Sequence, residues 1–368
     1  MTSGSLPARS AADVKTATAG APAGGAAAVP GREAGRLSPT LLPVAPSPID
    51  RRSEERADAG FLASLLRQPG TLAVLVSQRR AAFTGDRLAF IPVRLVPAHW
   101  LDGLVVYLGR LGEAPRGRAT ADAGPGADVV LVVLPEPVEP VAGVMSEAAG
   151  EGAELLDAET HWAGFREAGA HLDAVEAALL VEATAISNWH EGHVRCPRCG
   201  APTEVVHSGW VRRCPEDGTE HFPRTDPAII VTVVGPDGRL LLGTGAQMRS
   251  TMYSTLAGFV EPGESLEQAV VREIAEEVGV HVTDCQYLGS QPWPFPASLM
   301  LGFTARTTDS DAAPDGTEVV RARWFERDEL QSAVLAGEVT LPSRLSIARA
   351  LIEHWFGGVL AEPAGERR

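Results

Sequence analysis

The chain has 368 residues, of which 45% are hydrophobic, and this is enough apolar surface to build packed cores in two or three domains. The formal net charge of −15 argues against non-specific nucleic-acid binding, which depends on clustered Lys and Arg. No apolar run approaches the roughly 20 residues that a membrane-spanning helix needs, and the first residues lack the pattern of a secretory signal. We therefore expect a cytoplasmic protein with no membrane partner.

The first predicted segment is a disordered tail over residues 1–55. Ten of the first thirty residues are Ala, and Gly and Pro make up much of the rest. Such a stretch has too little bulky apolar surface to offset the entropy lost when a chain becomes ordered.

Residues 56–190 predict an α+β domain. Short apolar runs rich in β-branched residues predict strands over 71–78, 87–96, 103–109 and 127–134. Apolar residues at helical spacing predict a helix from Asp173 to Trp189. Nine acidic residues between 145 and 182 fit a solvated helical face better than a binding patch. Nothing in this domain suggests chemistry.

A short Arg-rich segment, residues 193–225, contains three of the four cysteines. Cys196 and Cys199 have the Cys-x-x-Cys-Gly spacing of a zinc knuckle, and fourteen residues separate Cys199 from Cys214. This pattern predicts a structural zinc ribbon, with a metal-free ribbon held by packing as the alternative. The fourth cysteine, Cys285, lies in a predicted strand and is expected to be a core residue.

The sequence does not decide which residue is the fourth zinc ligand. Position 217, where a second Cys-x-x-Cys would end, holds Asp217, whose carboxylate can ligate zinc. His221 is the main alternative, and Glu216 or Glu220 could compete. The segment also holds the local basic cluster, where an RNA body could bind: Arg195, Arg198, Arg212, Arg213 and Arg224.

The third predicted domain, residues 226–356, contains a 23-residue pattern that begins at Gly258. It predicts a Gly-rich loop leading into a helix, with Glu264 and Ser265 at the helix start and Gly279 at its end. The helix places Glu273, Glu276 and Glu277 on one face, where the carboxylates repel one another unless a cation lies between them. Oxygen ligands suit Mg²⁺ or Mn²⁺. Arg272 could orient a carboxylate by paired hydrogen bonds.

The complete pattern, Gly-x5-Glu-x7-Arg-Glu-apolar-x-Glu-Glu-x-Gly-apolar, resembles the box of the Nudix hydrolases. The resemblance implies an α/β/α sandwich around a mixed sheet, and hydrolysis of a nucleoside diphosphate linked to another group. It also implies that Glu273, Glu276 and Glu277 bind Mg²⁺ or Mn²⁺, which polarises the pyrophosphate and activates water. Glu318 matches a further carboxylate used for metal binding or catalysis.

A second motif, Ser290-Gln-Pro-Trp-Pro-Phe-Pro-Ala-Ser298, narrows the substrate. It resembles the signature of the NADH pyrophosphatase subfamily, whose members also remove the NAD cap from RNA. The subfamily has a β-rich N-terminal domain, a zinc ribbon and an aromatic-Pro-Arg element, here residues 222–224. This resemblance implies NAD(H) as substrate and NAD-capped RNA as a larger one.

The same resemblance implies the substrate contacts. Phe259 would stack on the nicotinamide, with Phe222 supplied from the other subunit of a homodimer. Further contacts would come from Gln291, Trp293 and Ser298. Two departures from the subfamily pattern are Asp217 in place of Cys and Ala297 in place of Gln.

Two other functions remain open from the residues. The first is a Nudix pyrophosphatase acting mainly on ADP-ribose or another dinucleotide. The second is a catalytically silent sensor of nucleotide or RNA, although none of the box glutamates is missing.

Overall fold

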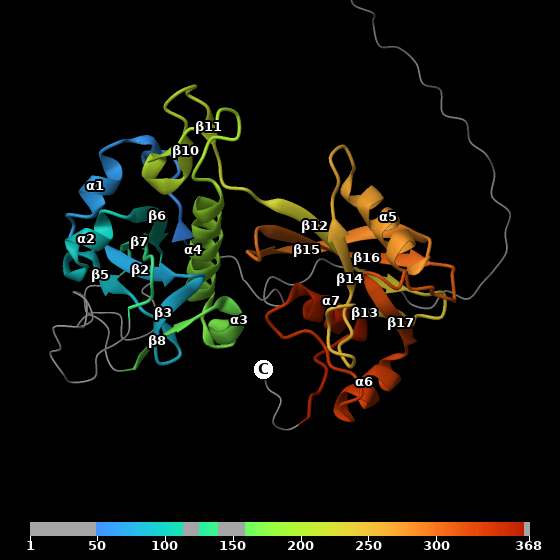
Figure 1. Ribbon diagram of the computed structural model, residues 1–368. Coiled ribbons are helices and arrows are strands. Elements are labelled where there is room, and N and C mark those ends of the chain that lie inside the picture. The colour runs from blue at the N-terminus through green and yellow to red at the C-terminus, as the bar shows by residue number, and fades with distance from the viewer. Residues whose placement is uncertain (1–48, 113–124, 139–158, 364–368) are drawn as a thin grey trace, which may run out of the picture. The chain divides into compact units, whose positions relative to one another are not determined.

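The computed structural model describes residues 49–112, 125–138 and 159–363 (Figure 1). Most of the predicted tail lies outside these residues. Strand β1 (Ile49–Asp50) belongs to the last part of that tail but pairs with β6 (Leu104–Leu111). The ordered chain therefore begins before the predicted boundary. Among the helices of the described ranges, none combines the length and apolar character that crossing a bilayer requires.

The N-terminal sheet has eight strands in the described chain, in the order β1-β6-β7-β2-β3-β4, with β5 paired to β2 and β8 paired to β3. After β1, its strands are β2 (Leu72–Ser77), β3 (Arg80–Thr84), β4 (Arg87–Leu88), β5 (Ile91–Pro92), β6 (Leu104–Leu111), β7 (Asp128–Val133) and β8 (Thr160–Ala163). Its helices are α1 (Phe61–Leu65), α2 (Ala98–Leu101), α3 (Phe165–Ala168) and α4 (Ala174–Gly192).

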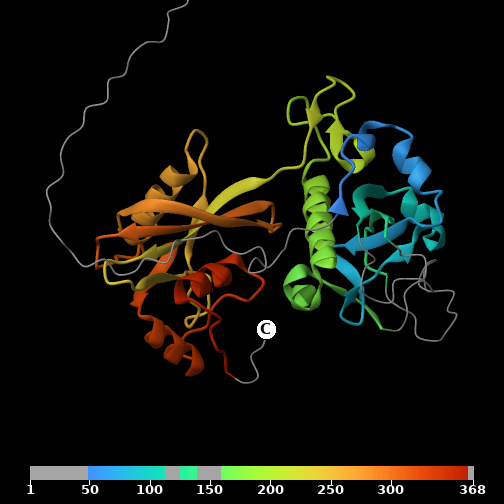
Figure 2. The same cartoon turned by 180° about the vertical axis from the view of Figure 1, so that it is seen from behind.

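Both faces of this sheet are buried, as strand β2 shows. Leu72 and Val74 belong to the core that includes α4, whereas Ala73 and Leu75 belong to a second core with α1 and α2. Figures 1 and 2, which view the molecule from the front and from behind, both show α4 beside this sheet. Burial on both faces explains why these strands appear in the sequence as continuous apolar runs rather than as alternating patterns.

The predicted single strand over 87–96 is wrong. The structure divides it into β4, β5 and a short 3-10 turn at Val93–Leu95. Pro92 ends β5, because proline has no N–H to donate to a sheet and its ring restricts the backbone.

Helix α4 begins where the sequence predicts and ends three residues later than predicted. The Asp173 carboxylate accepts hydrogen bonds from the N–H groups of Val175 and Glu176, and the Glu176 carboxylate accepts one from the Asp173 N–H. This reciprocal capping stabilises the helix start.

The cysteine segment, residues 193–225, contains a small three-stranded sheet in the order β11-β10-β9. Its strands are β9 (Glu204–Val206), β10 (Val211–Arg213) and β11 (Glu220–His221). The indole N–H of Trp210 donates to the Tyr107 carbonyl of β6 at 2.7 Å. The segment is therefore attached to the N-terminal sheet by a hydrogen bond as well as by the chain.

The C-terminal sheet has six strands in the described chain: β15-β16-β12-β13-β17, with β14 paired to β12. The strands are β12 (Asp226–Val234), β13 (Leu240–Gly245), β14 (Leu256–Phe259), β15 (Val282–Trp293), β16 (Ser298–Thr307) and β17 (Val319–Phe325). The α-helices of this domain in the described chain are α5 (Leu266–Val278), α6 (Arg327–Leu335) and α7 (Ile347–Phe356). Because β12 pairs in parallel with β16 and antiparallel with β13, the sheet is mixed.

Residues of β12 alternate between the two faces of this sheet. Ile229 and Val231 pack in one core with Ile274 of α5, whereas Ile230 packs in another with Leu351 of α7. Figures 1 and 2 show α5 on the opposite side of the sheet from α7. The predicted α+β protein with an α/β/α sandwich around a mixed sheet is confirmed.

Candidate active site and metal centres

The ends of helix α5 fix the register of the box glutamates. The Ser265 hydroxyl accepts from the Gln268 N–H at 3.2 Å, and the Gln268 side chain accepts from the Ser265 N–H at 2.9 Å. Gly279 ends the helix in the left-handed conformation, with φ of 67°. Glu264, which the sequence also places at the helix start, pairs with Arg272.

Arg272 organises the carboxylates of the box. Its Nε and Nη2 atoms each donate to Glu264 at 2.8 Å, and Nη1 donates to Glu273 at 2.9 Å and to Glu276 at 3.1 Å. Nη2 also donates to the Phe259 carbonyl at 2.9 Å. The planar guanidinium thus joins the Gly-rich loop to the helix. The predicted orienting contact is present, and it raises the pKa of Arg272.

Gly258 is glycine because the Glu273 carboxylate needs the space beside it. A Cβ atom at position 258 would lie 1.9–2.3 Å from the carboxylate atoms of Glu273, in direct conflict with them. The first glycine of the box therefore allows β14 to approach the helix face closely. Glu273 is 9% exposed in this arrangement.

Glu277 has the environment of a carboxylate suited to binding a cation. Its side chain is 7% exposed, and its Oε2 atom is buried without a hydrogen-bond partner among the described residues. Burial raises the pKa of Glu277 to about 8, and the charges of Glu273 and Glu318 add to the shift. A buried carboxylate with a free oxygen, close to other carboxylates, is stabilised by a bound cation. The residues therefore fit the Mg²⁺ or Mn²⁺ that the Nudix box implies.

The other two acidic residues lie at the open side of this group. The Glu276 side chain is 62% exposed, and Glu318 is exposed on the loop that precedes β17. The charge of Glu318 reaches both Glu273 and Glu277 strongly enough to raise the pKa of each, after the larger effect of burial. The structure therefore brings the four predicted metal ligands into one neighbourhood.

The two predicted stacking rings are exposed. Phe259 is 56% exposed and Phe222 is 62% exposed, whereas the other phenylalanines that the structure describes are buried or half-buried. Phe259 is paired with Ala228 near the start of β12, on the side of that strand opposite to β16. The N-terminal end of β12 therefore lies beside the box.

Ser298 lies at the same end of the sheet. It begins β16, is paired with Asp226 of β12 and is 8% exposed. Trp293 ends β15 directly opposite Ser298, and its ring meets Phe295 edge-on at 5.2 Å between centroids. The alternating prolines and aromatics thus form the turn between β15 and β16, close to the start of β12.

Gln291 does not fit the predicted nucleotide contact. It is 1% exposed, its amide nitrogen donates to the Leu345 carbonyl, and its amide oxygen accepts from the Ile347 N–H, each at 2.7 Å. Both polar atoms therefore hold the start of α7. We correct its assignment from substrate binding to support of the fold.

The cysteine segment brings together four atoms suited to zinc. One ligand atom from each of Cys196, Cys199, Cys214 and Asp217 lies within 4.8 Å of all the others. The Cys199 and Cys214 sulfurs are 3.5 Å apart, and the Cys196 sulfur lies 3.8 Å from Asp217 Oδ2. Sulfur ligands around a tetrahedral zinc ion lie about 3.7 Å apart, because each Zn–S bond is about 2.3 Å long. The four side chains therefore fit a zinc ion.

The geometry favours Asp217 as the fourth ligand. Its Oδ1 accepts from the Thr219 N–H at 2.9 Å, which lowers the pKa of Asp217 to about 2 and leaves Oδ2 beside Cys196. His221 is near enough to help lower the pKa of Cys196, against the opposing effect of desolvation, but it is not part of the four-residue cluster. Glu216 and Glu220 are also outside the four-residue cluster, and Glu220 pairs with Arg213.

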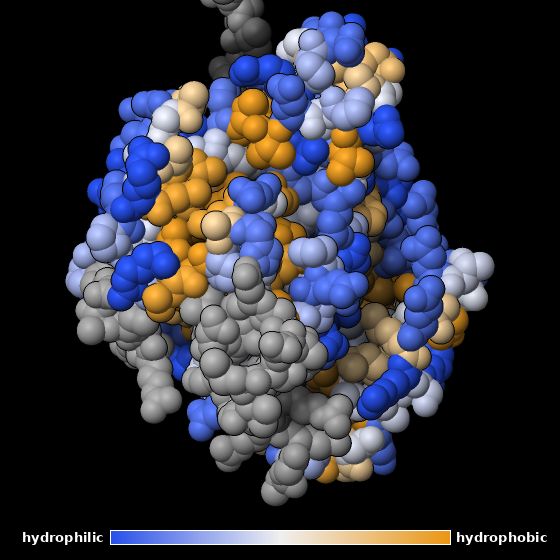
Figure 3. Space-filling view, turned by 60° about the vertical axis from the view of Figure 1, so that its left-hand side comes forward, coloured by the Kyte–Doolittle hydropathy of each residue, from blue (hydrophilic) through white to orange (hydrophobic). Residues whose placement is uncertain are grey.

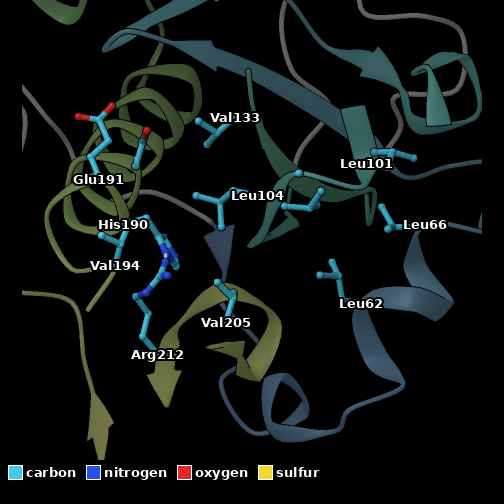
Figure 4. Close-up of a pocket in the computed structure, with 13 residues that line it drawn as sticks. Leu62, Leu66, Leu101, Leu104, Val133, His190, Glu191, Val194, Val205 and Arg212 are labelled. Carbon is cyan, nitrogen blue, oxygen red and sulfur yellow. Dashed lines mark hydrogen bonds between the residues drawn. The ribbon is translucent and has the colours of Figure 1, made fainter. Parts of the chain in front are cut away.

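The arginines of the predicted basic cluster contact different residues and do not form one exposed group. Arg212 is 8% exposed and donates to Thr203 Oγ1 at 2.7 Å and to the His190 ring at 2.8 Å, as Figure 4 shows for the His190 pair. Arg213 pairs with Glu220. Burial alone lowers the pKa of Arg212. Arg212 is therefore held inside the fold, and the prediction that it belongs to a basic cluster open to an RNA body is wrong for this residue. Arg198 remains exposed.

An apolar cavity of about 560 Å³ lies elsewhere, between the N-terminal sheet and the cysteine segment (Figure 4). Its walls are mainly aliphatic: Leu62, Leu66, Leu101, Leu104, Val105, Val133, Val194 and Val205. Figure 3 is turned so that the side with the N-terminal sheet comes forward. It shows a patch of apolar residues on this side, surrounded by hydrophilic ones. No residue of the box lines this cavity, so it is separate from the chemistry of the carboxylates.

Comparisons with known proteins agree with these two centres. The NUDIX domain model matches residues 224–344, and the model of the NADH pyrophosphatase zinc ribbon domain matches residues 193–222. The NAD-capped RNA hydrolase NudC of Stutzerimonas stutzeri (strain A1501) is 43% identical over 202 residues, which cover 55% of this chain and 70% of that protein. The chain belongs to the NAD-capped RNA hydrolase family of Nudix proteins.

Two further relatives show how far the family likeness extends. NAD-capped RNA hydrolase NUDT12 of Macaca fascicularis is 30% identical over 345 residues, or 84% of this chain and 72% of the relative. NAD-capped RNA hydrolase NudC of Mycobacterium bovis (strain BCG / Pasteur 1173P2) is 44% identical over 199 residues, or 52% of this chain. The match spans 64% of the length of that mycobacterial protein.

Asp315 is a site residue that the sequence did not indicate as functional. It precedes Gly316, and an Asp-Gly pair signals a turn but not its purpose. Its contacts with the loop of Glu318 are visible only in the folded chain.

Proposed function

We propose that this protein hydrolyses the pyrophosphate of NAD(H) to NMN(H) and AMP, and that NAD-capped RNA is a larger substrate of the same site. In this reaction a water oxygen bonds to one phosphorus, the bridging P–O bond breaks, and the two phosphates share the released protons with solvent. Family membership supports the proposal, as does the NAD-capped RNA hydrolase activity for which the relatives are named.

The observation that carries the proposal is the free Oε2 atom of Glu277, buried close to Glu273 and Glu318. We assign Mg²⁺ or Mn²⁺ to this group, with Glu276 as the exposed fourth ligand. A divalent cation bound there would neutralise charge on the pyrophosphate and make a water molecule more nucleophilic. Arg272 keeps Glu273 and Glu276 in place by hydrogen bonds, whereas Glu277 Oε2 has no hydrogen-bond partner among the described residues.

Two exposed rings support the assignment of the nicotinamide site. Phe259 follows Gly258 of the box, and Phe222 lies four residues before β12. A planar base stacked between two rings would cover apolar surface that is now exposed to solvent. We assign Phe222 to the site of the opposite subunit in a homodimer. Ser298 and Trp293 remain proposed nucleotide contacts.

We assign the zinc ion a structural role and the protein a cytoplasmic location. Zinc would occupy a closed set of four ligands with no position left for substrate. Free thiols at ligand spacing persist in a reducing compartment.

The experiment is product analysis after incubation of purified protein with NADH and Mg²⁺ or Mn²⁺. AMP and NMNH should appear with the intact protein and disappear when Glu277 is replaced by Gln. If folded protein releases neither product with either cation, the proposal is contradicted. The catalytically silent sensor of nucleotide or RNA then becomes the favoured function.

A second candidate substrate has one observation in its favour. Because both polar atoms of Gln291 are used inside the fold, the signature motif offers one contact fewer for discriminating among dinucleotides. ADP-ribose or another dinucleotide is therefore the alternative substrate. Competition between NADH and ADP-ribose at equal concentration, followed by separation of the products, distinguishes the two.

A further inference from the structure

Glu318 needs support from its backbone, because its side chain is exposed and the residues just before it form no regular structure. The charge of Glu318 nevertheless acts on both Glu273 and Glu277. A mobile carboxylate would lose entropy each time it joined a metal site, so a fixed backbone would favour binding. The contacts of the loop 313–319 show how it is held.

The first support comes from the end of helix α5. The Ala313 N–H donates to the Val278 carbonyl at 2.8 Å, and the Asp315 N–H donates to the Glu277 carbonyl at 3.0 Å. The last carbonyls of a helix lack partners within the helix, so they are available to bind a neighbouring loop. The loop is therefore attached to the same helix, and at one point to the same residue, that provides the metal ligands.

The second support is the Asp315 carboxylate. Its Oδ1 accepts from the Val319 N–H at 2.8 Å, and its Oδ1 and Oδ2 lie 3.2 and 3.1 Å from the Glu318 nitrogen. The Thr317 hydroxyl also donates to Oδ2. These donors, with the Thr317 hydroxyl first, lower the pKa of Asp315 to about 2.

The third support lies on the other side of Glu318. The Glu318 carbonyl accepts from the Ala246 N–H at 3.0 Å, and Val319 is paired with Gly245 as β17 begins. Gly316 makes the turn possible, with φ of 78°, and its N–H donates to the Val319 carbonyl at 3.0 Å. Glu318 is thus held through its N–H by Asp315 and through its carbonyl by the residue that follows β13.

We infer that Asp315 is the positioning residue for Glu318: it connects the end of the metal-binding helix to the backbone of the residue that completes the carboxylate group. This inference rests on the proposed function, because it gives Asp315 no activity of its own. Its carboxylate oxygens already accept from backbone and hydroxyl donors, which distinguishes it from Glu277 with its unpartnered oxygen.

The test compares Asp315→Ala with Asp315→Asn. Asparagine keeps an oxygen that accepts from the Glu318 and Val319 N–H groups but removes the charge. We expect Asp315→Ala to lower kcat by about tenfold and to raise the Mn²⁺ concentration for half-maximal rate, because a displacement of about 1 Å can cost up to 10²-fold. Asp315→Asn should stay within about threefold of wild type, since the contacts persist.

The matched control is Asp311→Ala in the same connection between β16 and β17, which removes an equal charge but none of the contacts to Glu318. It should leave kcat and the Mn²⁺ requirement unchanged. Thermal unfolding of each variant shows whether the protein is folded.

A double-mutant cycle separates positioning from a general structural effect. If Asp315 acts through Glu318, adding Asp315→Ala to Glu318→Ala should lower kcat no further. An equal loss in both backgrounds overturns the inference, as does an Asp315→Asn variant as defective as Asp315→Ala, which would assign the role to charge. Wild-type protein that cleaves no NADH fails the proposed function instead. Mn²⁺ binding to wild type and Asp315→Ala, followed by electron paramagnetic resonance, then still tests the positioning.

Discussion

The cysteine segment and the box helix both bring acidic or thiol side chains together, but the ligand atoms have different partners in the two places. In the cysteine segment, four ligand atoms lie within 4.8 Å of one another, and the second oxygen of Asp217 accepts from the Thr219 N–H. In the box, Arg272 binds three glutamates, whereas Glu277 Oε2 is buried without a partner in the described chain.

This difference separates a structural centre from a reactive one. A closed set of four ligands can hold an ion and cross-link a small sheet that has few apolar residues of its own. A set with one unpartnered oxygen and an exposed side, such as that of Glu276 and Glu318, leaves room for substrate and water. The two centres should therefore respond differently to loss of a single ligand.

The largest expected effect is at Glu277. Replacing it with Gln keeps the shape but removes the charge of the most buried box carboxylate, so kcat for NADH should fall by about 10³-fold or more. The protein should remain folded, because an amide is less costly to bury than an unpaired carboxylate. Steady-state assays and thermal unfolding check the two parts. Glu267→Gln, an exposed position in the first turn of the same helix, is the control. Activity retained in Glu277→Gln would remove the box from the chemistry.

The next effect concerns stability at the cysteine segment. Cys199→Ser should abolish zinc binding and lower the unfolding temperature by several degrees or more, since the ion supplies much of the folding free energy of such a small unit. Zinc content by mass spectrometry and thermal unfolding with and without a chelator measure the change. Cys285→Ser is the matched control, because Cys285 packs against the core of the C-terminal sheet and lies outside the cluster. Equal zinc content in the wild type and Cys199→Ser would show that the cluster holds no zinc.

What the sequence predicts well in the two centres is local. The ends of α5, the shared face of its glutamates and the Cys-x-x-Cys knuckle all depend on residues a few positions apart. Helix periodicity and turn chemistry determine such contacts directly.

What the sequence does not predict depends on contacts between distant residues. The Gln291 amide meets Leu345 and Ile347, more than fifty positions later, and the Arg212 guanidinium is buried against His190, 22 positions earlier. Nothing in a motif shows whether a polar side chain points to a ligand or to the backbone of another element. The family resemblance identified the Gln as functional and the residue types suggested the Arg cluster, whereas their partners in the fold assign Gln291 and Arg212 to structure.

The third prediction uses the raised pKa of Glu277. Burial first, and then the charges of Glu273 and Glu318, raises this pKa to about 8, so without a cation the group is mostly protonated at pH 7. A cation must displace that proton, and affinity for Mg²⁺ should therefore fall as pH falls: about tenfold per unit below pH 8, with little change above it. Calorimetric titrations between pH 6.5 and 8.5 measure this slope. A constant affinity over that range would show that Glu277 is already ionised in the free protein.

The smallest effect should follow Asp217→Cys, which changes the one oxygen ligand of the cysteine segment into a fourth thiolate. Zinc should be retained about tenfold more strongly against a chelator, because thiolate is a better zinc ligand than carboxylate. NADH cleavage should not change, because Asp217 is neither a ligand of the box nor a proposed substrate contact. The rate of zinc loss to a chromogenic chelator, compared with that of His221→Ala, measures the effect. If His221→Ala loses zinc rapidly and Asp217→Cys gains nothing, the imidazole is the fourth ligand. Carboxylate ligands would then belong to the box alone, and the zinc centre would use three thiolates and an imidazole.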